Sequence, residues 1–176
     1  MKINVSNIPA EGLKLHFSKD AKWFVDLWPS DDRMNFAFHD AGLSFSLKKI
    51  GETVFIEGKV VTTVELECCR CLERTTKILH GDFKYTFEPS RSHDNEEIEL
   101  SVEDLEISYY DNDLIDLDQI AFEQIALQIP MKALCSESCK GLCPQCGMNL
   151  NLSSCQCRSD FVDDRLAVLK DFKVKE

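Results

Sequence analysis

Alternation of apolar and polar residues is clearest in the middle of the chain, where it predicts antiparallel β-strands. Residues 53–67 place Val54, Ile56, Val60, Val64 and Leu66 on one side. The other side is mixed and includes Glu57, Lys59, Thr63, Glu65 and Glu67. This period of two is typical of a strand with one buried and one solvated face. Residues 73–87 repeat the pattern, with Phe83, Tyr85 and Phe87 on one side. The two segments together predict a long hairpin.

Shorter segments upstream also alternate. Residues 2–5 and 12–17 are predicted short strands. Residues 34–38 and 43–47 each place apolar side chains on one face, and the polar stretch 39–42 between them is predicted as a turn. The first half of the chain is therefore rich in β-structure.

A helix is predicted directly before a proline. Asp116 has the side chain of an N-cap, and Gln119 completes a capping-box arrangement. The helix is expected over 117–128, and Pro130 ends it because proline cannot donate the next backbone hydrogen bond. The face expected to be buried comprises Leu117, Ile120, Ala121 and Ile125.

Four other segments have weaker signals. Residues 22–28 predict one or two helical turns, whose two tryptophans are expected to lie in or over the core. Residues 88–103 are expected to form an acidic mobile loop. Residues 105–109 are a candidate edge strand, and 161–172 are predicted as a short amphipathic helix.

Negative charge is concentrated in one part of the chain. The formal net charge is −11 with a pI near 4.8, and residues 88–118 alone contain twelve acidic residues and one basic residue, Arg91. This balance argues against non-specific binding to nucleic acid, although a local basic face remains possible. The sequence shows neither an eighteen-residue apolar run nor a signal-peptide pattern, so we expect a cytoplasmic protein with no membrane partner.

The spacing of the cysteines indicates metal binding. Six of the nine cysteines lie within residues 135–157. Cys143 and Cys146 are two residues apart, with Pro144 to set the turn and Gly147 to accept a positive φ after it. Two thiolates at this spacing can point at one ion, as in zinc knuckles. In a reducing cytosol such thiols are expected to bind metal rather than to form disulfides.

The number of cysteines fits two four-thiolate sites and one spare thiol, because Cys68 and Cys71 repeat the two-residue spacing upstream. Four thiolates close a tetrahedral zinc site and leave no position for substrate, so both ions are expected to be structural. Cys69 is the expected spare. In the alternative pairing, Cys143 and Cys146 join the upstream pair. The preferred groups are Cys68, Cys71, Cys135 and Cys139, and Cys143, Cys146, Cys155 and Cys157.

Two other uses of the thiols are weaker hypotheses. A redox enzyme using Cys68 and Cys71 would need an exposed thiolate at a helix N-terminus, whereas this motif joins two strands. An iron–sulfur centre would absorb visible light. The sequence shows no phosphate-binding glycine loop and no nucleophile motif, so neither an enzyme nor a small-molecule substrate is expected. The isolated histidines are expected to be non-catalytic: His16, His39, His80 and His93.

These elements together predict an α+β fold. Its body, residues 1–130, is an antiparallel β-sheet or barrel-like structure that ends in a C-terminal helix. Residues 131–176 are predicted to form a cysteine-rich zinc-binding tail, with its own short helix, packed on the body.

The order of motifs resembles that of the YceD family, the large ribosomal RNA subunit accumulation proteins. The resemblance rests on Cys68-x-Arg-Cys-Leu-Glu73 after a long strand and on Asp116-Leu117 opening a helix that ends in Leu-Gln-Ile-Pro130. It continues through residues 134–151, which include Gly-Leu-Cys143-Pro-x-Cys and Asn-Leu-Asn151, and closes with 165–169.

The resemblance covers roughly residues 45–172, with two departures from the family pattern. Asp164 stands where the family tends to have proline, and Cys69 is an additional thiol. The resemblance implies a cytosolic, non-enzymatic factor for accumulation of large-subunit ribosomal RNA, acting through ribosome assembly or protection of precursor RNA.

Two partners remain open: a ribosomal RNA precursor, or large-subunit ribosomal proteins. Zinc knuckles can bind RNA, and basic residues near the cysteines would form a patch for it, unless they are only scattered solvated charges. A net charge of −11 equally favours a basic protein surface. The basic residues are Arg70, Arg74, Lys77, Lys132, Lys140 and Arg158.

Overall fold

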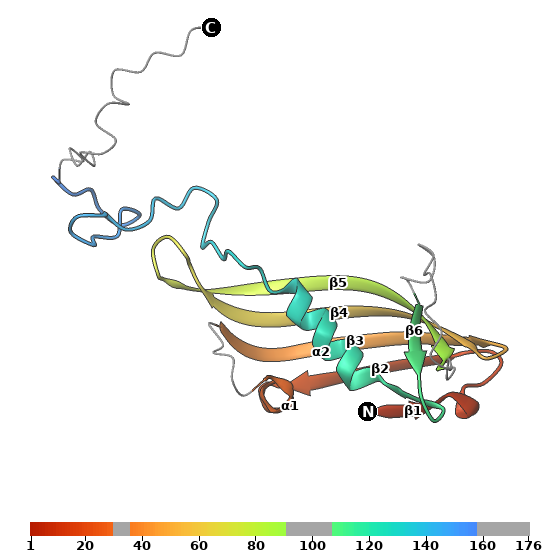
Figure 1. Cartoon of the computed structure of the whole chain (residues 1–176). Helices are drawn as coiled ribbons and strands as arrows, with labels where there is room; N and C mark the ends of the chain where they lie inside the picture. Colours follow the sequence, from red (N-terminus) through yellow and green to blue (C-terminus); the bar gives the residue numbers. More distant parts are fainter. Residues whose placement is uncertain (30–35, 91–106, 158–176) are drawn as a thin grey trace, which may run out of the picture.

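A five-stranded sheet forms the body of the protein (Figure 1). The computed structural model describes residues 1–29, 36–90 and 107–157. The strand order is β2-β3-β4-β5-β6, and the neighbours up to β5 are antiparallel. The strands are β2 (Leu13–Asp20), β3 (Phe36–Ile50), β4 (Thr53–Glu67), β5 (Arg74–Pro89) and β6 (Ile107–Tyr110). The predicted sheet is confirmed, and within the described residues its pairing ends at β2 and β6.

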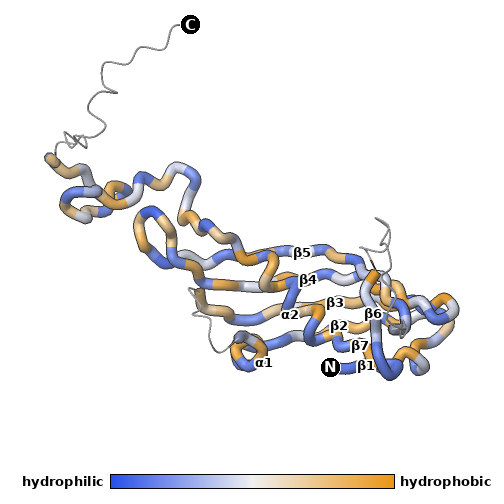
Figure 2. Tube along the Cα trace, viewed as in Figure 1, coloured by the Kyte–Doolittle hydropathy of each residue, from blue (hydrophilic) through white to orange (hydrophobic). Residues whose placement is uncertain are grey.

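The central hairpin has the predicted alternation. Every second residue of β4 from Val54 to Leu66 is buried, and the residues between them are exposed or half-buried. Figure 2 shows hydrophobic and hydrophilic stretches interspersed along the strands of the sheet. Pairing with β5 runs from Val54 opposite Phe87 to Glu67 opposite Arg74, so the Cys68–Cys71 motif forms the tip of the hairpin. This long, well-paired hairpin positions the motif at one end of the molecule.

A β-bulge replaces the predicted turn at residues 39–42, so that prediction is wrong. Phe38 pairs with Val64 and Asp40 with Thr63, which leaves His39 as one extra residue inside a continuous β3. An extra residue shifts the side-chain alternation by one position. The shift places Phe38 before the bulge and Ala41 after it on the same buried face.

Helix α2 (Leu117–Gln128) crosses one face of the sheet and covers the core (Figure 1). Its buried residues are the four that the sequence predicted. Asp116 is its N-cap, as predicted, and accepts hydrogen bonds from the N–H groups of Asp118 and Gln119. The Gln119 side-chain amide donates to Glu123 at 2.9 Å, on the side of the helix that continues away from the N-cap.

A second, shorter helix covers the same face near the bulge. Helix α1 (Ala21–Leu27) buries Phe24 completely and stacks its ring on Phe38 with 4.4 Å between centroids. Both tryptophans, Trp23 and Trp28, are half-buried against this core, as predicted.

The N-terminal segment completes the body. The predicted strand at residues 2–5 is present as β1 (Lys2–Asn4), and a 3₁₀ turn (Val5–Asn7) follows it. β1 pairs antiparallel with β7 (Leu114–Asp116), a strand that the sequence did not predict.

The predicted edge strand is present as β6, and its direction departs from the predicted antiparallel sheet. It pairs parallel with the end of β5, Thr86 lying opposite Ile107. Tyr110 is buried and its hydroxyl donates to the carbonyl of Glu52, while Tyr109 is exposed.

Some predictions are not tested by the described part of the chain. The predicted helix over 161–172 and most of the acidic segment lie outside the described residues. The division into a body and a tail at residue 130 stays a prediction. Among the described residues, no helix combines the length and apolar character needed to cross a bilayer.

Candidate metal centre

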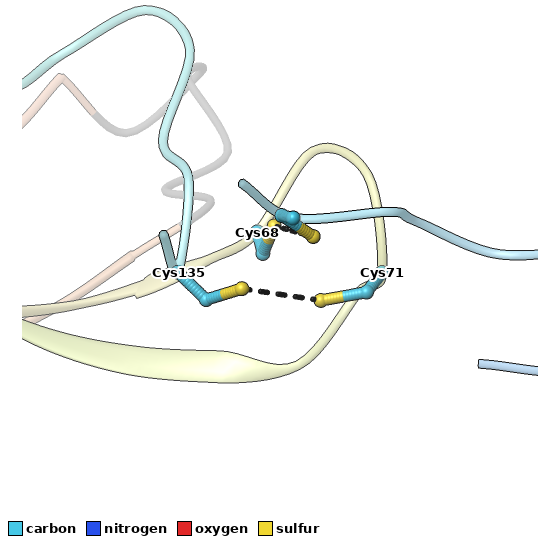
Figure 3. Close-up of side chains that lie close together, drawn as sticks. Cys68, Cys71 and Cys135 are labelled. Carbon is cyan, nitrogen blue, oxygen red and sulfur yellow. Dashed lines mark hydrogen bonds between the residues drawn. The ribbon is translucent and has the colours of Figure 1, made fainter. Parts of the chain in front are cut away.

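The first thiol group joins the hairpin tip to the segment that follows α2. The sulfurs of Cys68 and Cys71 meet those of Cys135 and Cys139, and all four lie within 4.8 Å of one another. Figure 3 shows Cys71 and Cys135 pointing their sulfurs at each other from these two segments. Cys68, Cys71 and Cys139 are buried, beside the half-buried Leu134 and Leu142.

The hairpin tip has the backbone geometry of a metal knuckle. The N–H of Leu72 donates to the carbonyl of Cys68 at 2.9 Å, and the N–H of Cys68 donates to the carbonyl of Glu73 at 2.9 Å. Leu72 has a φ of 61°, in the left-handed region that favours glycine. The turn directs both thiols to one side.

Backbone hydrogen bonds fasten the tail to this tip. The N–H of Cys69 donates to Ala133 at 2.9 Å, and the N–H of Leu142 donates to the carbonyl of Arg70 at 3.0 Å. The Arg70 guanidinium donates to the carbonyl of Cys139 at 2.9 Å. Gly141 lies against the tip, since an added Cβ there would be 3.0 Å from the carbonyl of Arg70. The thiols thus meet within a preorganised backbone frame.

The sulfur spacing of the first group fits a tetrahedral metal ion. The Cys68–Cys139 and Cys71–Cys135 sulfur pairs are 3.8 and 3.6 Å apart. Four sulfurs at about 2.3 Å from a central zinc ion would be about 3.8 Å apart, whereas a disulfide needs about 2.05 Å. All nine cysteines are free thiols.

The second thiol group is built wholly within the tail. The sulfurs of Cys143, Cys146, Cys155 and Cys157 also lie within 4.8 Å of one another. The N–H of Gly147 donates to the carbonyl of Cys143 at 2.9 Å, the bond that Leu72 makes in the first knuckle. Unlike the first group, it is open to solvent, since Cys146 and Cys157 are exposed and only Cys143 is buried.

Backbone donors favour a thiolate in each group. The N–H of Cys135, followed by that of Cys71, lowers the pKa of Cys68 to about 6. The N–H groups of Cys146 and Gln145 lower the pKa of Cys143 to about 6. These two thiols are therefore poised to lose their protons near neutral pH.

Neighbouring sulfurs oppose further ionisation. The N–H of Glu73 favours a thiolate at Cys71, but burial and the nearby thiols outweigh it and raise the pKa of Cys71 to about 12. The Cys146 side chain raises the pKa of Cys157 to about 12. A divalent cation at the centre of each group would remove this conflict, because it binds all four sulfurs as thiolates and releases their protons.

The structure brings the eight predicted ligands together in the preferred pairing and not in the swapped one. Cys69 is exposed and lies outside both groups. Sequence reasoning missed Asn151, whose side-chain amide donates to the sulfur of Cys139 at 3.3 Å and lowers the pKa of that thiol. The asparagines of the Asn-Leu-Asn151 motif were the available signal.

Some of the basic residues near the thiols form hydrogen bonds or ion pairs, and others are exposed to solvent. Arg70 donates to tail carbonyls, and Arg74 forms an ion pair with Glu65 at 2.9 Å. Lys132 and Lys140 are exposed at the surface of the tail. Arg158 lies outside the described residues.

Fold and site together define a β-sheet protein whose cysteine-rich tail is held to a hairpin tip by four thiols suited to a metal ion. The chain belongs to the YceD family, since the model for the large ribosomal RNA subunit accumulation protein YceD matches residues 56–173. The family name refers to accumulation of the large ribosomal RNA subunit. No solved structure matches the chain.

Several curated proteins are similar to this chain. A chloroplastic protein of Arabidopsis thaliana, named large ribosomal RNA subunit accumulation protein YCED homolog 1, is 26% identical over 89% of this chain and 52% of its own length. An uncharacterized protein of Mycobacterium bovis is 28% identical, over 72% of this chain and 59% of the relative. The uncharacterized protein YlbN of Bacillus subtilis is 39% identical over 39% of this chain and 41% of its own length. The chain thus spans about half the length of the relatives it matches.

Proposed function

We propose that this protein is a non-enzymatic cytoplasmic factor that supports accumulation of large-subunit ribosomal RNA, by assisting ribosome assembly or protecting precursor RNA. Two structural zinc ions would hold its tail in a fixed contact surface. The observation that carries the proposal is the first thiol group, which joins residues 64 and 71 positions apart at the hairpin tip. Membership of the YceD family supplies the pathway.

A structural role for the metal follows from the ligand set. Four cysteine thiolates fill the coordination sphere of zinc, whereas catalytic sites keep one position for water or substrate. The eight proposed ligands are Cys68, Cys71, Cys135 and Cys139 at the first ion and Cys143, Cys146, Cys155 and Cys157 at the second. In this arrangement zinc contributes folding free energy to the tail.

Burial and grouping count against the alternative thiol redox function. A redox pair needs an accessible thiolate, whereas Cys68 and Cys71 are buried and each faces a further thiol of the tail. Reaction of the zinc-loaded protein with a disulfide reagent should therefore be slow at these two thiols.

The hairpin tip and tail form the proposed contact surface for a ribosomal RNA precursor or a large-subunit ribosomal protein. The exposed Lys132 and Lys140, together with Arg70 at the tip, can approach phosphate groups. The acidic remainder of the chain favours a basic protein surface equally.

The proposal is tested by reversing charge on this surface in cells whose own copy is replaced. The double variant Lys132→Glu and Lys140→Glu should lower the ratio of large- to small-subunit ribosomal RNA and weaken co-sedimentation with large-subunit precursors. The matched control is Lys14→Glu with Lys48→Glu, which makes the same charge change at exposed positions of the sheet. Equal ribosomal RNA ratios in all three strains would contradict the proposed surface. Crosslinking would identify the partner as RNA or protein.

A further inference from the structure

We propose that Asn151 couples the two metal sites: the loop closed by the second thiol group holds this side chain, which donates a hydrogen bond to a ligand sulfur of the first. The inference rests on the proposed zinc sites and assigns the Asn-Leu-Asn151 motif a role as their link.

Both ends of the Asn151 side-chain amide contact the segment around Cys139. Its Nδ2 donates to the Cys139 sulfur at 3.3 Å, while its Oδ1 accepts from the N–H of Lys140 at 2.8 Å. Nδ2 also donates to Oδ1 of Asn149 at 3.0 Å, and the same oxygen accepts from the N–H of Asn151. Asn149 thus fixes the orientation of the Asn151 amide.

The loop that carries Asn151 is closed by the second thiol group. The loop begins after Cys146 and ends at Cys155, and both cysteines belong to the second group. Within it, the N–H of Leu150 donates to the carbonyl of Gly141 at 2.9 Å. Opening the second group would release the end of the loop that follows Asn151, whereas the Leu150–Gly141 bond holds its start. The position of Asn151 therefore depends in part on that group being closed.

A hydrogen bond to a ligand sulfur affects the metal directly. A donor near a thiolate offsets part of its charge and orients its lone pairs, and loss of such an outer partner typically costs about 10- to 100-fold in metal affinity. Metal in the second group would therefore strengthen binding in the first. Because binding free energies are reciprocal, metal in the first would strengthen the second by the same factor.

Site-resolved zinc titration tests the coupling. The full chain is equilibrated in zinc buffers, its unprotected thiols are alkylated, and peptide mapping gives the free zinc at half-protection for each group. Asn151→Asp keeps the acceptor for Lys140 but removes the donor to Cys139. It should raise the free zinc for half-protection of Cys68 and Cys71 about 10- to 100-fold. Ser153→Ala, in the same loop, should leave it unchanged.

A double-mutant cycle separates coupling from local damage. Opening the second group with Cys155→Ser and Cys157→Ser should weaken the first group by a factor similar to that of Asn151→Asp. Combining the three changes should weaken it little further. The coupling is wrong if Asn151→Asp or the double serine variant leaves first-group protection unchanged, or if their effects multiply. No zinc protection of any thiol in the unaltered protein would instead contradict the proposed zinc sites.

Discussion

Leu72 occupies a backbone conformation that suits glycine better than leucine. The second knuckle has Gly147 at the equivalent position, with a φ of 72° against 61° for Leu72. A leucine in this region costs about 1–2 kcal/mol relative to a right-handed conformation. Its side chain is 56% exposed, so little apolar burial offsets this cost.

Replacing Leu72 by glycine is expected to stabilise the hairpin tip. Relief of the left-handed strain should exceed the roughly 0.5–1 kcal/mol of backbone entropy that glycine loses on folding. We expect the free energy of unfolding to rise by about 0.5–1 kcal/mol, measured by thermal unfolding at fixed free zinc. Gly147→Ala should lower it instead, and a loss of stability in Leu72→Gly would mean that the leucine side chain makes a compensating contact.

Sequence reasoning found the thiols that the structure brings together but not the residues that arrange them. Two-residue spacing marks Cys143 and Cys146 because it reflects local backbone geometry. Leu72 carries no signal for a positive φ, and the hydrogen bond from Asn151 to Cys139 depends on the folded loop. These contacts follow from the tertiary structure of the tail.

At the scale of elements, the start of α2 depends on one carboxylate. Asp116→Ala removes the acceptor for two N–H groups of the first turn and should lower the free energy of unfolding by about 0.5–2 kcal/mol in urea denaturation. Asp116→Asn keeps an acceptor and should retain most of that stability. Because Gln119 bonds to Glu123, Gln119→Ala should change stability by less than about 0.5 kcal/mol. A larger loss of stability in Gln119→Ala would indicate that Gln119 does complete the predicted capping box.

The strands could be predicted where buried and exposed residues alternate without a break, and less well elsewhere. Residues 53–67 alternate without interruption, and the structure pairs all of them. At His39 the alternation shifts by one, and a bulge and a turn produce the same shift in the sequence. β6 has only four residues, so its alternation does not fix its direction. Three-residue β7 is shorter still.

At the scale of the whole molecule, two zinc ions per chain are expected. Elemental analysis of protein purified without chelators should return two, and Cys69→Ser should also return two because Cys69 lies outside both groups. A value of one or none would contradict the two-site scheme. Loss of an ion from Cys69→Ser would show that this thiol is a ligand.

Loss of the first site and loss of the second should each unfold a different part of the tail. Cys68→Ser is expected to remove hydrogen-exchange protection from residues 131–142, since the first group holds the tail to the tip, while the second group stays folded as a detached unit. At saturating zinc, Cys143→Ser should deprotect only about 141–157, because its group lies within the tail. α2 and the middle of β4 should stay protected in both variants, since their core contains none of these thiols. Equal deprotection in both variants would contradict this division of roles.

The long separation between the two halves of the first group affects the newly made chain. Cys71 is synthesised 64 residues before Cys135, a delay of roughly 3–13 s at translation rates of about 5–20 residues per second. During that interval the finished hairpin presents Cys68, Cys69 and Cys71 side by side with no tail to receive them. Such thiols are open to oxidation or to a metal held by the wrong three sulfurs. In the proposed two-zinc scheme, the tip therefore has to stay reduced and free of other metals until the rest of the chain arrives.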